Sequence, residues 1–142
     1  MPCPLTPSEQ YAFMSLWCLM ASPLFYSGDM GRLDELTVSV LCNPELIEVN
    51  QDPLGQCGRV VKLGDLAFAM IKDLEDGSKA VGLFNPGEFP LTVTASWSAL
   101  ALQGAQRVRD LWRQQELGVK RDGYAALLPR RGGVVVRLWK AE

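Results

Sequence analysis

The side chains that could carry out chemistry in this chain are mainly carboxylates, because its 142 residues include 16 aspartates and glutamates and no histidine. The lack of histidine excludes a Ser-His-Asp or Cys-His nucleophile, a histidine-ligated zinc ion and acid–base catalysis by imidazole. The four cysteines, Cys3, Cys18, Cys42 and Cys57, form no Cys-x-x-Cys pair. We therefore expect no metal site, no cofactor and no thioredoxin-like site.

The cysteines leave the redox state of the chain open. Four cysteines allow three disulfide pairings, and their spacing neither chooses among these nor assigns a redox compartment. Cys18 lies in an apolar helical pattern, so we expect it to be a small buried hydrophobic residue.

Asp29 is the carboxylate whose position is most typical of a site residue. It follows the apolar run of residues 24–27, which predicts a buried parallel strand. Because α/β barrels place their chemistry at the carboxyl ends of such strands, Asp29 is a candidate binding residue. The alternative is a local role, in which Asp29 caps a helix or braces the turn between Gly28 and Gly31. Asp52, before a proline, is expected to be a turn residue.

The elements that would position Asp29 are helical. The capping-box sequence Thr-Pro-Ser-Glu predicts a helix over residues 7–21. Further helical patterns cover residues 33–42 and restart at Asn43. The first helix is apolar nearly all round, which requires cover on more than one side. Its predicted buried stripe consists of Phe13, Leu16, Trp17 and Met20.

From Arg59 onward the apolar pattern changes from helical to alternating. It predicts seven strands, over residues 59–63, 66–73, 79–84, 91–97, 106–112, 124–128 and 134–139. Because no helix separates them, these strands indicate an antiparallel β-sandwich. We place the domain boundary so that residues 1–56 and 57–142 form two parts that pack directly. All four tryptophans are expected in the core, with Trp112 and Trp139 inside the sandwich.

Charge and hydropathy exclude two classes of partner. The formal net charge of −2 gives no support for nucleic-acid binding. The apolar run of residues 11–25 is shorter than the roughly 20 residues that a membrane span requires. No basic residue precedes it, so it lacks the pattern of a signal peptide. We expect no nucleic-acid and no membrane partner.

Several motifs resemble a known family. Residues 16–24 (LWCLMASPL), 28–30 (GDM) and 49–55 (VNQDPLG) resemble the C-terminal part of the α-galactosidases of glycoside hydrolase family 27, as do residues 76–85 and 109–112 in the predicted sandwich. The resemblance covers essentially the whole chain from Leu5. It implies a fold of α/β plus all-β class, in which the last two helices and the last strand of a TIM (β/α)8 barrel precede an antiparallel β-sandwich.

The resemblance implies an activity but assigns no catalytic residue. Family members are retaining hydrolases that use two aspartates to release terminal α-linked galactose or N-acetylgalactosamine. Neither aspartate motif has a match between residues 1 and 142, so the chain alone is expected to be inactive. Asp29 would then lie at the rim of the eighth barrel strand as a candidate ligand for a sugar hydroxyl. The family is expected to be extracellular or periplasmic.

Two functions remain open at this point. The chain could be the C-terminal portion of such a hydrolase, closing the barrel and stabilising it through the sandwich, with a terminal α-galactoside as substrate. Alternatively, it could be a stand-alone, non-catalytic module that binds carbohydrate or protein. An incomplete barrel would leave residues 24–27 without neighbouring strands, which predicts aggregation or homo-oligomers through the exposed barrel edge.

Overall fold

The computed structural model describes residues 3–142, which form three helices, one 3-10 helix and eight strands. The helical elements are α1 (Pro7–Leu19), η1 (Met30–Arg32), α2 (Glu35–Leu41) and α3 (Pro44–Asn50). The strands are β1 (Arg59–Leu63), β2 (Ala67–Asp73), β3 (Lys79–Phe84), β4 (Leu91–Ser96), β5 (Gln106–Asp110), β6 (Gln115–Lys120), β7 (Gly123–Leu128) and β8 (Gly133–Lys140).

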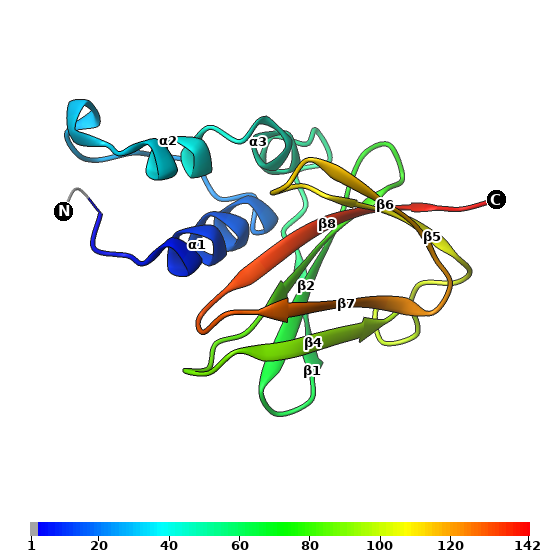
Figure 1. The fold of residues 1–142 in the computed structure, drawn as a ribbon. Helices are drawn as coiled ribbons and strands as arrows, with labels where there is room; N and C mark the ends of the chain where they lie inside the picture. The colour runs from blue at the N-terminus through cyan, green and yellow to red at the C-terminus, as the bar shows by residue number, and fades with distance from the viewer. Residues whose placement is uncertain (1–2) are drawn as a thin grey trace.

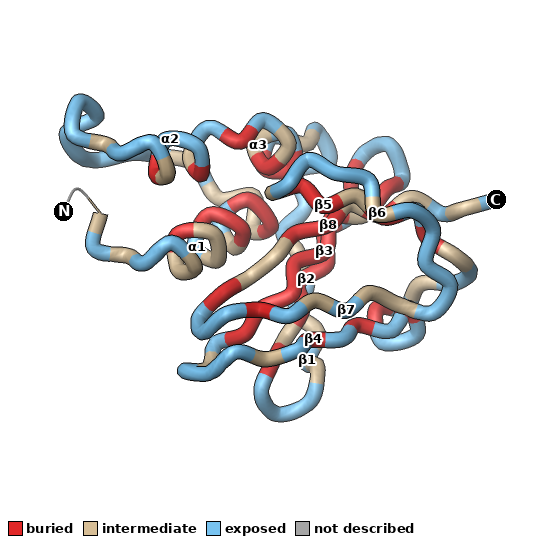
Figure 2. Tube along the Cα trace, in the orientation of Figure 1, coloured by how far each residue is buried: buried red, intermediate tan, exposed pale blue. Residues whose placement is uncertain are grey.

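These elements form three layers (Figure 1). The middle layer is a six-stranded antiparallel sheet in the order β1-β2-β3-β8-β5-β6. The pair β4 and β7 packs on one of its faces, and the helices α1, α2 and α3 pack on the other. The central strands are therefore buried on both faces, and Figure 2 shows the buried residues concentrated along them. The predicted antiparallel sandwich is confirmed, and the helices share a hydrophobic core with its larger sheet.

All seven predicted strands are present, and an eighth was missed. Strand β6 is exposed at five of its six positions, and only Leu117 and Val119 are apolar, so its sequence has too few apolar residues to predict a strand. It also contains Gly118 at a φ of +78°, and its partner β5 carries a register shift between Val108 and Arg109. A bulged edge strand of this kind leaves little periodic signal in the sequence.

The strand predicted over residues 24–27 is not formed. This segment belongs to no helix or strand, and its prediction was wrong at the level of local structure. Within residues 3–142 no other strand lies alongside it to exchange main-chain hydrogen bonds. A parallel strand exists only through such pairing, so an apolar run without a neighbour remains irregular. The division into domains at residue 56 stays a prediction.

The buried face predicted for α1 was wrong for Phe13 and Trp17, which are 51% and 36% exposed. The other two residues predicted for it, Leu16 and Met20, are partly buried against the core. The buried residues of the helix are Gln10, Met14, Ser15, Cys18 and Leu19. The helix approaches the sheet closely at Leu19, because a Cβ added to Gly82 would lie 2.5 Å from its Cδ1 atom. Close approach favours the small side chains of Ser15 and Cys18 at the interface.

Asn43 joins the helical layer to the sheet. Its Oδ1 accepts hydrogen bonds from the backbone N–H groups of Glu45 (3.0 Å) and Leu46 (3.1 Å), which caps α3. Its Nδ2 donates to the carbonyl of Leu111, 3.1 Å away. Asp52 has a comparable role, since its carboxylate accepts from the backbone N–H of Glu75 beyond β2. The turn role predicted for Asp52 is confirmed by a separate bond, in which the backbone N–H of Leu54 donates to its Oδ1 over 3.0 Å.

Replacing Asn43 by alanine is expected to lower the free energy of unfolding by about 2–3 kcal/mol, because it removes a helix cap and leaves a buried carbonyl without a partner. Urea titration followed by far-UV circular dichroism measures this change. The matched control is Asp34→Ala, which removes the cap of α2 and no bond to the sheet. It should cost only about 1 kcal/mol. Equal losses in the two variants would contradict the joining role of Asn43.

Candidate functional site

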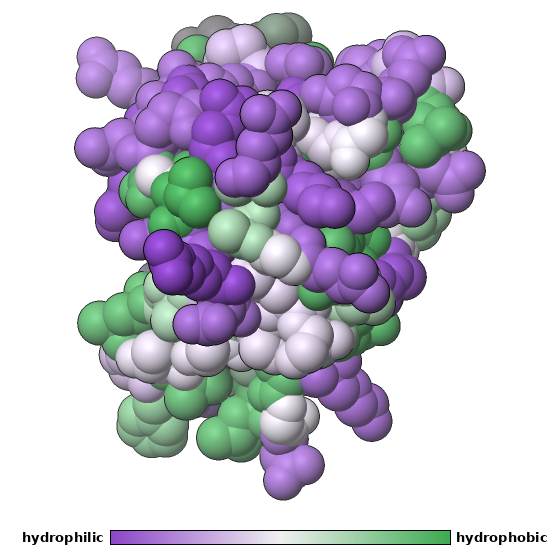
Figure 3. Space-filling view, turned by 90° about the vertical axis from the view of Figure 1, so that its right-hand side faces the viewer, coloured by the Kyte–Doolittle hydropathy of each residue, from purple (hydrophilic) through white to green (hydrophobic). Residues whose placement is uncertain are grey.

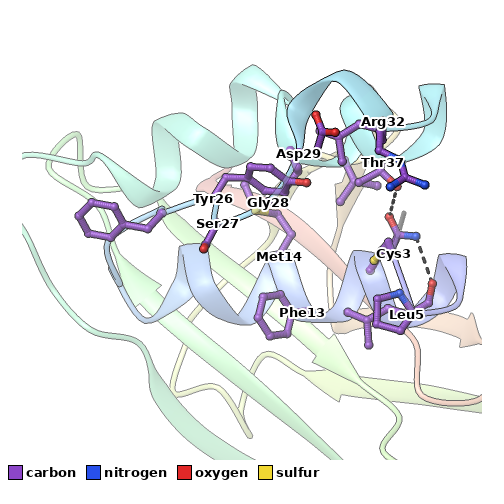
Figure 4. A pocket seen from close by; sticks show the side chains of 16 residues that line it. Cys3, Leu5, Phe13, Met14, Tyr26, Ser27, Gly28, Asp29, Arg32 and Thr37 are labelled. Carbon is purple, nitrogen blue, oxygen red and sulfur yellow. Dashed lines mark hydrogen bonds between the residues drawn. The ribbon is translucent and has the colours of Figure 1, made fainter. Parts of the chain in front are cut away.

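The predicted site residue Asp29 lies beside a hollow between α1, α2 and the irregular segment that connects them (Figure 4). The hollow has a volume of about 470 Å³. This is within the range of small-molecule sites. The polar and aromatic side chains that line it include those of Gln10, Phe13, Tyr26, Asp29, Arg32 and Thr37.

The buried polar groups of this hollow bond to one another. The Thr37 hydroxyl donates to Oε1 of Gln10 over 3.0 Å, and Nε2 of Gln10 donates to the carbonyl of Leu5 over 3.2 Å (Figure 4). These two bonds connect α2 to α1, and they satisfy the Thr37 hydroxyl and the side-chain amide of Gln10. The polar groups left toward solvent are those of Tyr26, Asp29 and their neighbours.

Asp29 has the local role that the sequence offered as the alternative. Its Oδ1 accepts from the backbone N–H of Gly31 over 3.0 Å and so caps η1. The carboxylate is exposed at the mouth of the hollow. Binding of a sugar hydroxyl by Asp29 stays a prediction.

Large hydrophobic side chains are exposed next to the hollow. Phe25 is 91% exposed, and the rings of Phe13 and Trp17 stack on each other at the surface with centroids 4.8 Å apart. Tyr26 and Met30 are exposed as well. We call these five residues the aromatic face. At the end of the molecule away from α2, the upper part of the surface is mostly hydrophilic, and hydrophobic side chains gather in the lower part (Figure 3).

The four tryptophans occupy different environments. Trp97 is buried between the two sheets, as predicted, whereas Trp17 belongs to the aromatic face and its core assignment was wrong. Trp112 lies on the helical side of the large sheet, where its Nε1 donates to the Ser15 hydroxyl over 2.8 Å. Trp139 is half-buried, with the guanidinium groups of two arginines stacked near its ring. Neither Trp112 nor Trp139 lies in the sandwich core.

The cysteines do not form a reactive or metal-binding cluster in the part of the chain that the structure describes. All four are free thiols. Cys18 is fully buried, as predicted, and burial raises its pKa to about 12. Residues 3–142 contain no group of three or more Cys, Asp or Glu side chains placed to hold a metal ion. Over the same residues, no helix has the length and apolarity needed to span a membrane.

A second hollow was missed by the sequence reasoning. It lies between β7 and the large sheet and is lined by Asp110, Trp112, Arg113 and Tyr124, among others. The sequence marks residues 109–112 as a family motif and residues 124–128 as a strand, but nothing in it predicts a shared hollow. Tyr124 joins this run through the packing of β7 on the large sheet, which no local pattern predicts.

This arrangement of helices and an antiparallel sandwich is that of the C-terminal part of a glycoside hydrolase. Residues 69–138 match the model of the α-galactosidase C-terminal β-sandwich domain, and residues 3–52 match the model described as alpha galactosidase A. The chain belongs to the α-galactosidases of glycoside hydrolase family 27 and corresponds to their C-terminal portion.

Individual relatives agree with this assignment. The chain is 34% identical over 140 residues to a probable α-galactosidase of Dictyostelium discoideum, covering 94% of this chain and 36% of that protein. It is 39% identical over 111 residues to an α-galactosidase of Coffea arabica, covering 76% of this chain and 29% of that protein. A family 27 β-L-arabinopyranosidase from Geobacillus stearothermophilus superimposes with a TM-score of 0.90 at 29% identity, covering 97% of this chain and 31% of that one. The chain thus spans about a third of the length of these relatives.

Proposed function

We propose that this chain is the C-terminal portion of a retaining α-galactosidase-like hydrolase that acts on terminal α-galactosides. In this proposal α1 to α3 complete the (β/α)8 barrel and the sandwich stabilises it. The two catalytic aspartates lie outside these 142 residues, so the chain alone does not turn over substrate. The names of the relatives support the substrate class.

The aromatic face is the observation that carries the barrel-closing role. Contiguous exposed hydrophobic side chains mark a surface that another protein segment covers. Beside them, residues 24–28 make no main-chain hydrogen bond to another main-chain group within residues 3–142. A run with free main-chain groups next to an uncovered apolar face is suited to pairing with neighbouring parallel strands. The proposed occupant is the part of the barrel that this chain does not contain.

Reconstitution tests this proposal. The chain alone is expected to show no hydrolysis of an aryl α-galactoside. Co-expression with the part of the Dictyostelium relative that lies outside the matched region should restore hydrolysis. Phe25→Asp should reduce the restored rate by at least about tenfold, since a charge in an apolar interface costs more than 1.4 kcal/mol.

Phe89→Asp is the matched control. Phe89 is also highly exposed, at 81%, but lies in the loop between β3 and β4. It should leave the restored rate within about twofold of the original, as expected for a surface position. Hydrolysis by the chain alone would contradict the absence of the catalytic residues. Equal effects of the two substitutions would contradict the barrel-closing role of the aromatic face.

Asp29 is tested in the same reconstituted enzyme. Asp29→Asn keeps an acceptor for the N–H of Gly31 and removes the negative charge that a sugar hydroxyl would bond to. We expect kcat/KM for the aryl α-galactoside to fall about tenfold, because a hydrogen bond to a charged group contributes about 1.5–3 kcal/mol. An unchanged kcat/KM would leave Asp29 with its turn-bracing role only.

A further inference from the structure

The hollow between β7 and the large sheet forms a groove that is separate from Asp29. Two adjoining hollows, of about 640 and 400 Å³, share Asp110, Arg113, Tyr124 and Ala125 along their walls. The larger one extends to the start of α1, and the smaller one extends to Lys120 at the end of β6. Volumes of this size are typical of small-molecule sites.

Asp110 contributes a buried carboxylate to the wall of this groove. Its side chain is 4% exposed, and Oδ1 accepts from the backbone N–H of Arg113 over 3.0 Å. Oδ2 forms an ion pair with Arg113, whose Nε lies 3.9 Å away, and this separation is beyond hydrogen-bond distance. No donor within residues 3–142 forms a hydrogen bond with Oδ2. Every side-chain nitrogen or oxygen that is fully buried in these residues has a hydrogen-bond partner, so Oδ2 is not fully buried. Oδ2 is therefore an acceptor reached from the groove.

Aromatic side chains form the walls beside this carboxylate. Tyr124 is half-buried, and burial together with the negative charge of Asp110 raises the pKa of its phenol. A phenol is protonated at neutral pH even at its ordinary pKa of about 10, so the hydroxyl of Tyr124 can donate a hydrogen bond. Trp112 and Tyr11 meet edge to face, with centroids 4.8 Å apart, and supply apolar surface at the other end of the groove.

The charges of the groove favour a neutral ligand. Arg113, whose side chain is 77% exposed, and Lys120 are both positive, so they oppose a cation near Asp110. The buried carboxylate of Asp110 opposes an anion. A neutral ligand with several hydroxyl groups can donate to Oδ2 of Asp110 and accept from the guanidinium of Arg113, both of which are charge-assisted hydrogen bonds.

We propose that this groove binds a glycosyl unit of an oligosaccharide. The hydroxyl groups of the sugar bond to Asp110, Arg113 and the phenol of Tyr124. The C–H face of the sugar packs on the aromatic walls. Such a site would hold a galactose-containing chain on the sandwich, independently of whether the barrel is complete.

Titration by NMR tests this proposal on the chain as it exists. Methyl α-D-galactoside and a galactose-containing oligosaccharide are added to the ¹⁵N-labelled protein. Saturable shifts are expected for the amides of residues 110–113 and 123–126. Asp110→Asn keeps an acceptor for the N–H of Arg113 and should weaken binding about tenfold, while Tyr124→Phe should weaken it about threefold.

The matched control is Asp122→Asn, on the exposed turn before β7, which should leave the affinity unchanged. The proposal is overturned if no shift saturates, or if Asp110→Asn binds as tightly as the original chain. Tighter binding of inorganic phosphate or butylamine in the groove would also overturn it, by showing a site for charged ligands. Because the readout is binding, its failure is distinguishable from failure of the reconstituted hydrolase.

Discussion

Replacing Trp97 by alanine is expected to lower the free energy of unfolding by about 3–5 kcal/mol, which is a large part of the 5–15 kcal/mol typical of a domain. Trp97 is buried between the two sheets, among side chains from both. Its Nε1 also donates to the carbonyl of Lys120 over 3.0 Å and so anchors the end of β6. Removal creates a cavity between the sheets and leaves that carbonyl without its partner. Urea unfolding followed by far-UV circular dichroism measures the loss.

Trp17→Ala is the control of equal side-chain size. Trp17 packs on Phe13 at the surface, and its Nε1 donates to the carbonyl of Pro23 over 3.1 Å. Its replacement should cost less than that of Trp97 in the isolated chain, because Trp17 is already 36% exposed to water, against 3% for Trp97. Trp97→Phe should fall between the two, because it keeps most of the volume and loses the hydrogen bond. If both alanine variants lost the same stability, the assignment of Trp97 to the core would be contradicted.

The contrast between these two tryptophans shows where periodicity predicts burial. In strand β4, Val93 and Ala95 alternate with exposed residues because only one face of the β4–β7 pair is covered, and the alternation predicts both the strand and its inner face. Helix α1 is apolar on every side, so its pattern fits several buried faces. Which side of α1 is buried depends on the large sheet, which approaches the helix closely at Gly82.

The same limit applies to the two candidate sites, of which the sequence pattern suggested one and not the other. The sequence points to Asp29 because it follows an apolar run, yet no strand within residues 3–142 pairs with that run and no strand forms there. The groove was missed for the opposite reason. Asp110 and Tyr124 lie on strands of different sheets, β5 and β7, so their juxtaposition follows from tertiary packing. The motif of residues 109–112 indicates the family, but it does not predict that Tyr124 lies on the other side of the groove.

Alkaline pH is expected to destabilise the chain through the thiol of Cys18. In the unfolded state this thiol loses its proton near its ordinary pKa of 9, whereas burial in the helix–sheet core raises its pKa in the folded state to about 12. Between these values the folded state holds one more proton than the unfolded state. Stability is therefore intact below pH 9 and falls as the pH rises, by about 1.4 kcal/mol per pH unit.

The comparison with Cys18→Ala isolates this effect. The buried ammonium of Lys72 faces the same region and donates to the carbonyl of Val49. Burial lowers the pKa of Lys72, so its contribution to stability changes with pH in the opposite direction. Lys72 is present in both proteins, so the part of its contribution that comes from its own burial is common to them, and only its charge interaction with Cys18 differs. The free energy of unfolding is measured by urea titration at pH 8 and at pH 10.5. At pH 8, Cys18→Ala should be less stable than the original chain. At pH 10.5, the free-energy difference between the two proteins should have moved by about 2 kcal/mol in favour of the variant. A difference that does not change with pH would mean that the Cys18 thiol is accessible to water in the folded chain.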